Sequence, residues 1–355
     1  RLAHVGWGVH LSGGKEGRMR YVIGLGDGTT GTKAVVCDES GCIHGKGYRE
    51  YEQMFGEHGE VEQRAQDWYE AAKGAVREAC AASGVPGSAI EAVSLSTQGG
   101  SMLAVDRNFA PLTNVMTWMD QRAAAEADEL CAAIGTEELY RASGWKPGAA
   151  YDCAKILWLR RHRPEIFART ASFVTTLEYM NMRLTGRNVS DPSNAAIRIL
   201  YHIREGRYDQ RILSFLGISV SQLPQILPAG CEIGCLTEAA ARDLGLHTGV
   251  RVYNGAHDQY CASLGAGAVS VGDMLVATGT AWVVLGVTDR LITSDTYVSP
   301  GIHPVKGLCG AMASLVSAGS VLKWYKNLIG EDYASLDEGA ALRRDHAADL
   351  FFAPY

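Results

Sequence analysis

The chain has 355 residues, of which 47% are hydrophobic and 20% are charged, and its formal net charge is −6. This length and composition predict about two globular domains and exclude a disordered or fibrous chain. Lys and Arg are scattered, so we expect no nucleic-acid partner, because phosphate backbones require a concentrated basic surface. The nine cysteines form no Cys-x-x-Cys pair, which favours reduced thiols and a cytoplasmic location over disulfides or a zinc site.

The ends of the chain carry no targeting or membrane signal. The longest apolar run, residues 274–287, is interrupted by polar residues and is too short to span a membrane. Residues 1–20 are basic and glycine-rich without an apolar core, so they do not form a secretory signal. We expect this segment to be extraneous or disordered and the fold to begin at Tyr21. The chain ends on an apolar stretch, which predicts that a domain is cut there.

The first predicted elements form a hairpin. Residues 21–25 and 33–38 are apolar and β-branched, which predicts two strands, and a turn rich in Gly and Thr joins them. Apolar residues then recur every three or four positions over 62–83, which predicts a helix, and Gly84 is its expected cap. Further strands are predicted at 92–96, 103–106 and 115–118, and further helices at 121–134, 153–162 and 177–184.

A second unit is predicted to open at Val250. A short strand leads through a turn into a helix from Gln259, and the strands 274–277 and 282–287 again flank a Gly/Thr turn. The two similar hairpins suggest two copies of one architectural unit. We therefore predict an α/β protein with a first domain over 21–249 and a second, incomplete domain over 250–355.

The first Gly/Thr turn indicates a phosphate site. Gly26-x-Gly28-x-x-Gly31 matches the dinucleotide fingerprint, but a strand follows it where that motif requires a helix, which disfavours a nicotinamide-dependent dehydrogenase. A P-loop is excluded because Thr32 precedes Lys33. Backbone N–H groups and Thr hydroxyls can bind phosphate oxygens, and the alternative is a tight turn that uses Gly for its conformation.

Six segments in order resemble the FGGY carbohydrate kinases, members of the actin-like ATPase superfamily. They are the first phosphate motif at 23–33, the strand end Ser96-Thr97-Gln98, the Trp118-x-Asp120-x-Arg122 element, the segment 190–195, the motif Gly255-Ala256-His257-Asp258-Gln259, and the second phosphate motif Thr278-Gly279-Thr280. The resemblance covers residues 21–355. It implies two RNase H-like domains around a central cleft, the first binding sugar and the second binding nucleotide.

The resemblance also implies an activity and its ligands. The expected reaction is the phosphorylation of a hydroxyl of a small sugar or sugar alcohol by ATP with Mg²⁺. The part of the second domain that holds the adenine is expected to lie beyond this chain. No membrane partner is expected, and a homodimer is left open.

The site residues follow from the same resemblance. Asp258 is expected to be the general base, although an Asp between a strand and a helix is by itself more often a helix N-cap. The residues expected at the ATP phosphates are Gly28, Thr29, Thr30, Thr32, Lys33, Gly279, Thr280 and Gly319. The residues expected at the sugar are Gln98, Gly99, Trp118, Asp120, Arg122 and Asp258.

Two departures from the family pattern stand out. Gly26 takes the position where the family has its metal-linked Asp, and Asp27 follows it, so Asp27 is expected on the other face of the strand and is only a candidate for the Mg²⁺ site. Gly99 and Gly100 replace the Arg-Glu pair of the glycerol kinases and the Met-His pair of the xylulose kinases, which predicts more room and fewer polar partners. A catalytically impaired, sugar-binding pseudokinase is therefore kept as an alternative.

Overall fold

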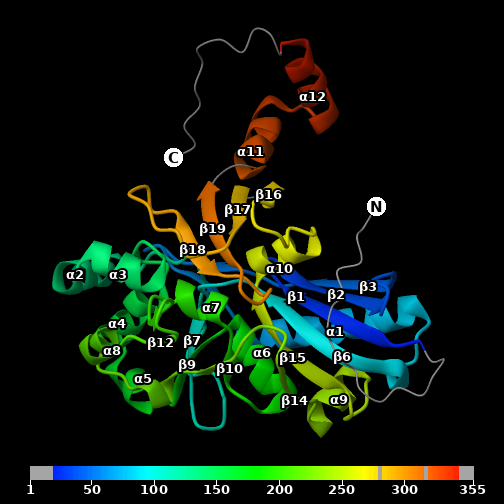
Figure 1. The fold of residues 1–355 in the computed structure, drawn as a ribbon, viewed down its shortest axis with the longest axis horizontal. Helices are drawn as coiled ribbons and strands as arrows, with labels where there is room; N and C mark the ends of the chain where they lie inside the picture. The colour runs from blue at the N-terminus through cyan, green and yellow to red at the C-terminus, as the bar shows by residue number, and fades with distance from the viewer. Residues whose placement is uncertain (1–18, 279–281, 316–318, 344–355) are drawn as a thin grey trace.

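A computed structural model describes residues 19–278, 282–315 and 319–343 (Figure 1). Residues 1–18 of the predicted extraneous segment lie outside the described residues, and so do Gly279 and Thr280 at the tip of the second predicted hairpin. The described residues form an α/β protein, as predicted, with a large lower body and a smaller sheet that rises from it.

A six-stranded sheet forms the centre of the lower body. Its order is β14-β15-β6-β1-β2-β3, with β1 parallel to β6, β6 parallel to β15, and the other neighbours antiparallel. The predicted first hairpin is confirmed, because Asp27 pairs with Thr32 at its tip. The strands are β1 (Tyr21–Asp27), β2 (Gly31–Asp38), β3 (Ile43–Glu50), β6 (Ile90–Thr97), β14 (Glu232–Cys235) and β15 (Arg251–His257).

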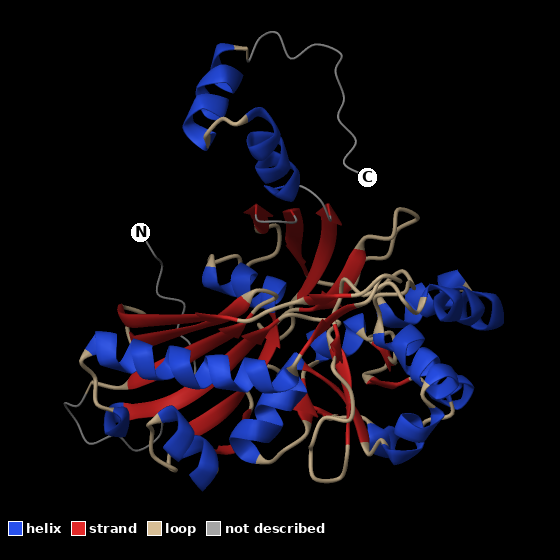
Figure 2. Ribbon diagram, turned by 180° about the vertical axis from the view of Figure 1, so that it is seen from behind, coloured by secondary structure: helices blue, strands red, loops and turns tan. Residues whose placement is uncertain are grey.

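The long helix α1 (Ala65–Ser83) covers one face of this sheet (Figure 2). Its apolar residues at helical spacing, among them Trp68, Ala72 and Val76, are fully buried against Ile23 and other residues of the strands. The predicted cap is confirmed, because Gly84 has φ +66° and its N–H bonds back to Ala81.

A second layer of the lower body joins a five-stranded sheet, in the order β4-β5-β8-β7-β9, to a group of helices with its own apolar core. The strands are β4 (Met54–Phe55), β5 (Val61–Gln63), β7 (Met102–Val105), β8 (Val115–Met116) and β9 (Ser172–Thr175). The helices around this core are α2 (Ala124–Ile134), α3 (Thr136–Ser143), α4 (Asp152–His162), α5 (Pro164–Arg169) and α8 (Gln210–Leu216). Helices α6 (Thr176–Thr185) and α9 (Glu238–Leu244) instead pack with α1 in the core of the six-stranded sheet, and α7 (Pro192–Ile197) contributes to a small separate cluster. Two small ribbons pair β10 (Val189–Ser190) with β13 (Gln225–Ile226) and β11 (Tyr201–His202) with β12 (Arg207–Tyr208).

The rising part is a four-stranded antiparallel sheet in the order β16-β17-β19-β18, followed by two helices (Figure 1). The second predicted hairpin is confirmed in its strands, since Thr278 pairs with Trp282. The elements are β16 (Met274–Thr278), β17 (Trp282–Thr288), β18 (Ser299–Ile302), β19 (Cys309–Leu315), α11 (Gly319–Ile329) and α12 (Tyr333–Leu342).

The position of β15 corrects the predicted organisation. We placed the start of the second unit at Val250, but β15 pairs with β6 inside the six-stranded sheet and leads into α10 (Asp258–Gly265). The first sheet therefore continues past residue 249, because its last strand comes from a distant part of the chain. Among the described helices, none is long and apolar enough to cross a membrane.

Candidate active site at the strand ends of the first sheet

The carboxyl ends of three parallel strands lie side by side. In the strand register, Asp27 of β1 is opposite Thr97 of β6, and Thr97 is opposite His257 of β15. In open α/β sheets this edge is where ligands bind. The register therefore brings three of the predicted motifs to one edge: the phosphate turn after β1, Gln98 after β6 and Asp258 after β15.

The tip of the first hairpin is held by hydrogen bonds from three other segments. The Thr29 carbonyl accepts a hydrogen bond from Nε2 of Gln63 at 2.7 Å, and the Thr29 hydroxyl oxygen accepts one from Nε1 of Trp118 at 3.0 Å. The Tyr51 hydroxyl donates to the Gly28 carbonyl. The N–H of Gly28 is used inside the turn, where it donates to the Gly31 carbonyl at 3.2 Å.

The predicted phosphate residues of this tip differ in accessibility. Thr30 and Lys33 are exposed, and among the described residues the N–H groups of Thr29 and Thr30 have no acceptor. Thr32 is fully buried, and its hydroxyl donates to Oδ1 of Asp27 at 2.5 Å. Thr29, Thr30 and Lys33 are thus accessible to a ligand at the tip, whereas Thr32 is buried and bonds Asp27. Gly319 begins α11, as predicted, and Gly279 and Thr280 lie outside the described residues.

Asp27 faces the interior of the protein. It follows Ile23 and Leu25 on the face of β1 that packs against the α1 core, and it is 0% exposed. Burial raises the pKa of its carboxyl to about 7. Among the described residues its Oδ2 has no partner. Because the Asp27 carboxyl points into the core and not toward the accessible tip of the hairpin, it fits a magnesium site poorly.

The described residues contain one other group with metal-ligating side chains. Asp38, Cys42 and His44 lie close together at the turn between β2 and β3. The Asp38 carboxylate already accepts hydrogen bonds from Ser40 and from the Cys42 N–H, and Nε2 of His44 lies 2.7 Å from it. This group closes a surface turn and is not part of the strand-end site.

The predicted sugar residues after β6 are buried and largely satisfied. Gln98 is 2% exposed, and its amide donates to Gln63 at 3.3 Å and accepts from Ser101 at 3.2 Å. The room expected at Gly99 is absent: a Cβ there would lie 2.8 Å from Cδ2 of His257 and 3.0 Å from Cδ1 of Ile197. The expectation of more space was wrong because a side chain distant in sequence fills it.

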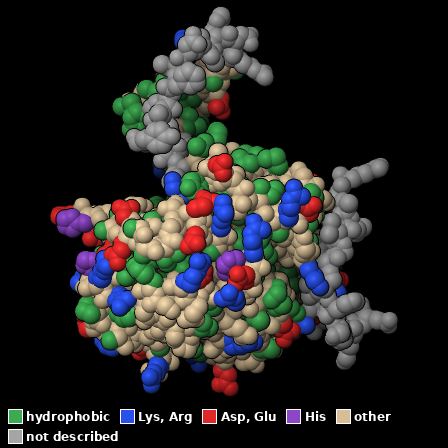
Figure 3. Space-filling model, turned by 60° about the vertical axis from the view of Figure 1, so that its left-hand side comes forward, with side chains coloured by type: hydrophobic (Ala, Val, Ile, Leu, Met, Phe, Trp, Pro, Cys, Tyr) green, Lys and Arg blue, Asp and Glu red, His purple; other side chains and the backbone are tan. Residues whose placement is uncertain are grey.

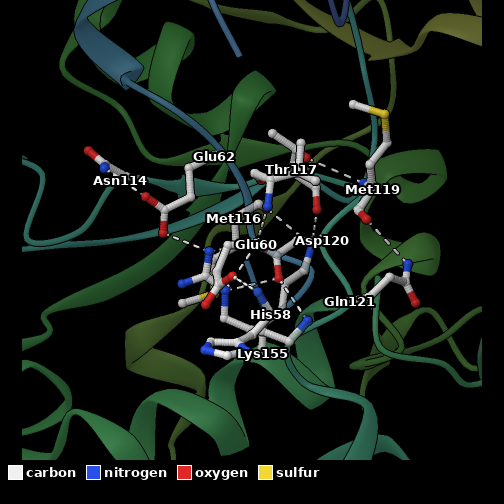
Figure 4. A network of polar contacts seen from close by, with 12 residues as sticks. His58, Glu60, Glu62, Asn114, Met116, Thr117, Met119, Asp120, Gln121 and Lys155 are labelled. Carbon is white, nitrogen blue, oxygen red and sulfur yellow. Dashed lines mark hydrogen bonds and ion pairs between the residues drawn. The ribbon is translucent and has the colours of Figure 1, made fainter. Parts of the chain in front are cut away.

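Asp120, which is labelled in Figure 4, binds Arg122 and the backbone of Val61. Asp120 is 0% exposed and accepts from the Val61 N–H at 2.9 Å and from Nη2 of Arg122 at 2.7 Å. The same Nη2 also donates to Glu62 at 2.7 Å. These contacts turn both predicted sugar residues toward the protein. In this arrangement they fasten the segment that carries Trp118, whose half-buried indole remains the accessible part of the motif.

Asp258 is the carboxylate that the structure leaves most available at this edge. It is the first residue of α10, but His257 occupies the N-cap position and no side-chain cap hydrogen bond is present. The helix-cap alternative is therefore not what the structure shows. The Asp258 side chain is 36% exposed, and its Oδ1 lies 3.3 Å from Nε2 of His257.

Sequence reasoning passed over two groups that shape this edge. Ser193 accepts the His257 N–H at 3.0 Å and donates to Asp191 at 2.5 Å, which ties the start of α7 to the Asp258 motif. Lys155 is fully buried and donates to the carbonyls of Thr117, which precedes Trp118, and of Gly100, which follows Gly99. A lysine inside an apolar helical pattern was the available signal for the second group.

Comparisons with known proteins find a matching family, sequence relatives and similar solved structures. Residues 21–265 match the model of the FGGY family of carbohydrate kinases, N-terminal domain. The chain is 27% identical over 340 residues to the xylulose kinase of Bacillus subtilis (strain 168), which covers 95% of this chain and 68% of that protein. It is 29% identical over 324 residues to the glycerol kinase of Trichlorobacter lovleyi, and this match covers 88% of this chain and 64% of that protein. The crystal structure of xylulose kinase from Rhodospirillum rubrum superimposes with a TM-score of 0.85 at 27% identity, over 91% of this chain and 67% of that one. This chain thus spans about two thirds of the length of these relatives.

Proposed function

Because the chain belongs to the FGGY family of carbohydrate kinases, we propose that it takes part in the ATP-dependent phosphorylation of a hydroxyl group of a small sugar or sugar alcohol. The observation that carries this proposal is the meeting of the phosphate turn, the Trp118 segment and Asp258 at one edge of the first sheet. The strand that follows the glycine-rich turn argues against a dehydrogenase, because a dinucleotide pyrophosphate needs a helix N-terminus there.

Asp258 is proposed as the general base. Its carboxylate accepts the proton of the attacking hydroxyl while that oxygen forms the new bond to the γ-phosphorus and ADP leaves. Phosphoryl transfer has a loose transition state, so the carboxylate acts mainly by orienting the hydroxyl. The partial exposure of Asp258 and the absence of a capping hydrogen bond support this role.

The acceptor is proposed to lie against Trp118, with Asp258 on its reactive side. An indole offers an apolar face to the C–H groups of a sugar, and Trp118 is oriented by its hydrogen bond to Thr29. Thr29, Thr30 and Lys33 are proposed to meet the ATP phosphates, together with Gly279, Thr280 and Gly319. ATP is proposed to enter as its magnesium complex, with the ion arriving on the nucleotide as part of the substrate. Activity inside the cytoplasm and a homodimer stay predictions.

The decisive experiment is an ADP-release assay of the full-length protein with ATP, Mg²⁺ and a panel of pentuloses, hexuloses and polyols. We expect turnover with at least one of these acceptors and none with NAD and a secondary alcohol. If calorimetry shows acceptor binding but no turnover is found, the chain is a sugar-binding pseudokinase and not an active kinase. If neither binding nor turnover is found with any acceptor, the proposed function is wrong.

A further inference from the structure

Lys155 is a charged side chain enclosed completely by the protein. It lies in the first turn of α4 and is 0% exposed. Its Nζ donates three hydrogen bonds, all to backbone carbonyls: to Thr117 at 2.7 Å, to Gly100 at 2.8 Å and to Met116 at 3.1 Å. An ammonium group has three donors and no acceptor, so this set of carbonyls satisfies it fully.

The nearby carboxylates are engaged elsewhere. Asp152, one turn earlier on α4, pairs with Arg198 at 2.6 Å, and Asp120 pairs with Arg122 at 2.7 Å. The direct hydrogen-bond partners of Lys155 are therefore backbone atoms of two particular segments, and its local role is to hold those segments.

The two segments are those that carry the proposed acceptor residues. Gly100 directly follows Gln98 and Gly99 at the end of β6, and Met116 and Thr117 directly precede Trp118 at the end of β8. Figure 4 labels Lys155 together with Met116 and Thr117, whose carbonyls it binds, and with Asp120. One ammonium group thus joins two chain segments that are also connected by the strand pair Met102–Met116 and by the hydrogen bond from the Trp118 N–H to Ser101 at 3.3 Å.

We propose that Lys155 is a positioning residue of the acceptor site, which clamps the end of β6 to the end of β8 and so fixes Trp118 relative to Gly99. The proposal rests on the proposed function, because it concerns the same acceptor. Without the ammonium group, each of the three buried carbonyls loses a donor, and the Thr117 carbonyl keeps its hydrogen bond from the Asp120 N–H at 3.0 Å; the two segments then separate until water reaches them. Displacement of the indole weakens acceptor binding, whereas the ATP phosphates meet the hairpin tip and are affected less.

The charge of Lys155 makes this clamp sensitive to alkaline pH. Burial lowers the pKa of its ammonium to about 8, although the carboxylates of Asp152 and Asp120 favour the charged form. The positive Arg122 and the thiol of Cys153 are the other titratable groups that act on it. A neutral amine keeps two donors and turns a lone pair toward one of the carbonyls, so acceptor binding weakens as pH rises through about 8.

The test compares Lys155→Met and Lys155→Arg with Lys73→Met, a control on α1 whose ammonium pairs with Glu70 and lies over the Tyr69 ring, away from the acceptor segments. We expect Lys155→Met to raise the acceptor KM about 10- to 100-fold, because buried carbonyls lose a donor, and to raise the ATP KM much less, because Trp118 contacts the hairpin tip only through its hydrogen bond to Thr29 among the described residues. The control variant should alter neither constant. Equal rises in both KM values, or no rise in the acceptor KM, would overturn the proposal.

A pH series keeps the proposal testable if Lys155→Met does not fold. We expect the wild-type acceptor KM to rise above pH 8 and the KM of Lys155→Arg, which stays charged, to remain level. A wild-type KM that is level from pH 7 to about 9.5 contradicts the clamp. If the wild type phosphorylates no acceptor, the proposed function fails, and hydrogen exchange decides the clamp separately. Faster exchange confined to residues 99–101 and 116–119 in Lys155→Met supports it, and uniformly faster exchange overturns it.

Discussion

The hairpins β1–β2 and β16–β17 have the same sequence pattern, yet the protein covers them differently. In the first hairpin, Ile23 and Val36 are 1% and 0% exposed beneath α1. In the second hairpin one face is buried around Leu285, but Met274 and Val276 on the other face are 63% and 58% exposed. An alternating pattern determines which residues share a face of a sheet, but those side chains are buried only where another element packs on that face.

The same contrast extends to the helices that follow. α1 lies flat on the first sheet, whereas α11 rises away from the second, and hydrophobic side chains gather where it leaves the body (Figure 3). Trp324, Tyr325 and Leu328 of α11 are each about half exposed or more. Apolar patches of this kind mark surfaces that interact with other chain segments or molecules. The first region thus buries the apolar residues of its hairpin, whereas the described part of the second leaves one face of its hairpin exposed. Four experiments test this comparison.

The largest expected effect is on turnover, at the strand-end site of the first sheet. Asp258→Asn should lower kcat about 10²- to 10⁴-fold with little change in the acceptor KM, because an amide cannot accept the proton. Asp289→Asn, in an exposed position after β17 of the second sheet, is the control and should keep normal kinetics. Steady-state assays with the preferred acceptor measure both variants. Near-normal turnover of Asp258→Asn would show that Asp258 only begins α10.

The second effect concerns the buried carboxyl in the first hairpin. The pKa of Asp27 is raised in the folded protein, so its contribution to stability is fully present below about pH 4 and is lost as pH rises through about 7. Relative to Asp27→Asn, the wild type should therefore lose stability on the order of a few kcal/mol between pH 4 and pH 8. Urea unfolding at pH 5, 6.5 and 8 measures the difference. Parallel stability curves for the two proteins would mean that Asp27 is ionised inside the fold.

The third effect concerns packing at the strand end. Gly99→Ala should cost about 1–3 kcal/mol of unfolding free energy, because its Cβ would lie 2.8 Å from the His257 ring. In a His257→Ala background the same substitution should cost much less, since the ring is gone. A double-mutant cycle by chemical denaturation measures this coupling. Additive costs would place the His257 ring elsewhere in solution.

The smallest expected effect comes from the same substitution, Val to Thr, made in each of the two hairpins. Val36→Thr in β2 should cost about 1–3 kcal/mol, because it buries a hydroxyl at a position that is 0% exposed. Val276→Thr in β16 should stay within about 0.5 kcal/mol, because the side chain is 58% exposed. Thermal unfolding measures both. Equal costs would mean that the exposed face of the second sheet is covered in solution.

The sequence by itself determined the local elements and the order of the motifs. Both hairpins, helix α1 with Gly84 as its cap, and the place of Asp258 between a strand and a helix were predicted correctly. These features depend on alternation, on helical spacing and on the conformational freedom of glycine, all of which act within a few residues of the chain. The family motifs were recognised for the same reason, since each is a short contiguous segment.

Only the tertiary structure decided how the site residues are used. Asp120 is engaged by the N–H of Val61, 59 residues away, and the space at Gly99 is filled by His257 from another strand. Lys155 reaches the Gly100 carbonyl across 55 residues, and β15 enters the first sheet although we assigned it to the second unit. Burial, hydrogen-bond partners and shifted pKa values depend on atoms brought together by folding, and no spacing along the chain encodes which of them will meet.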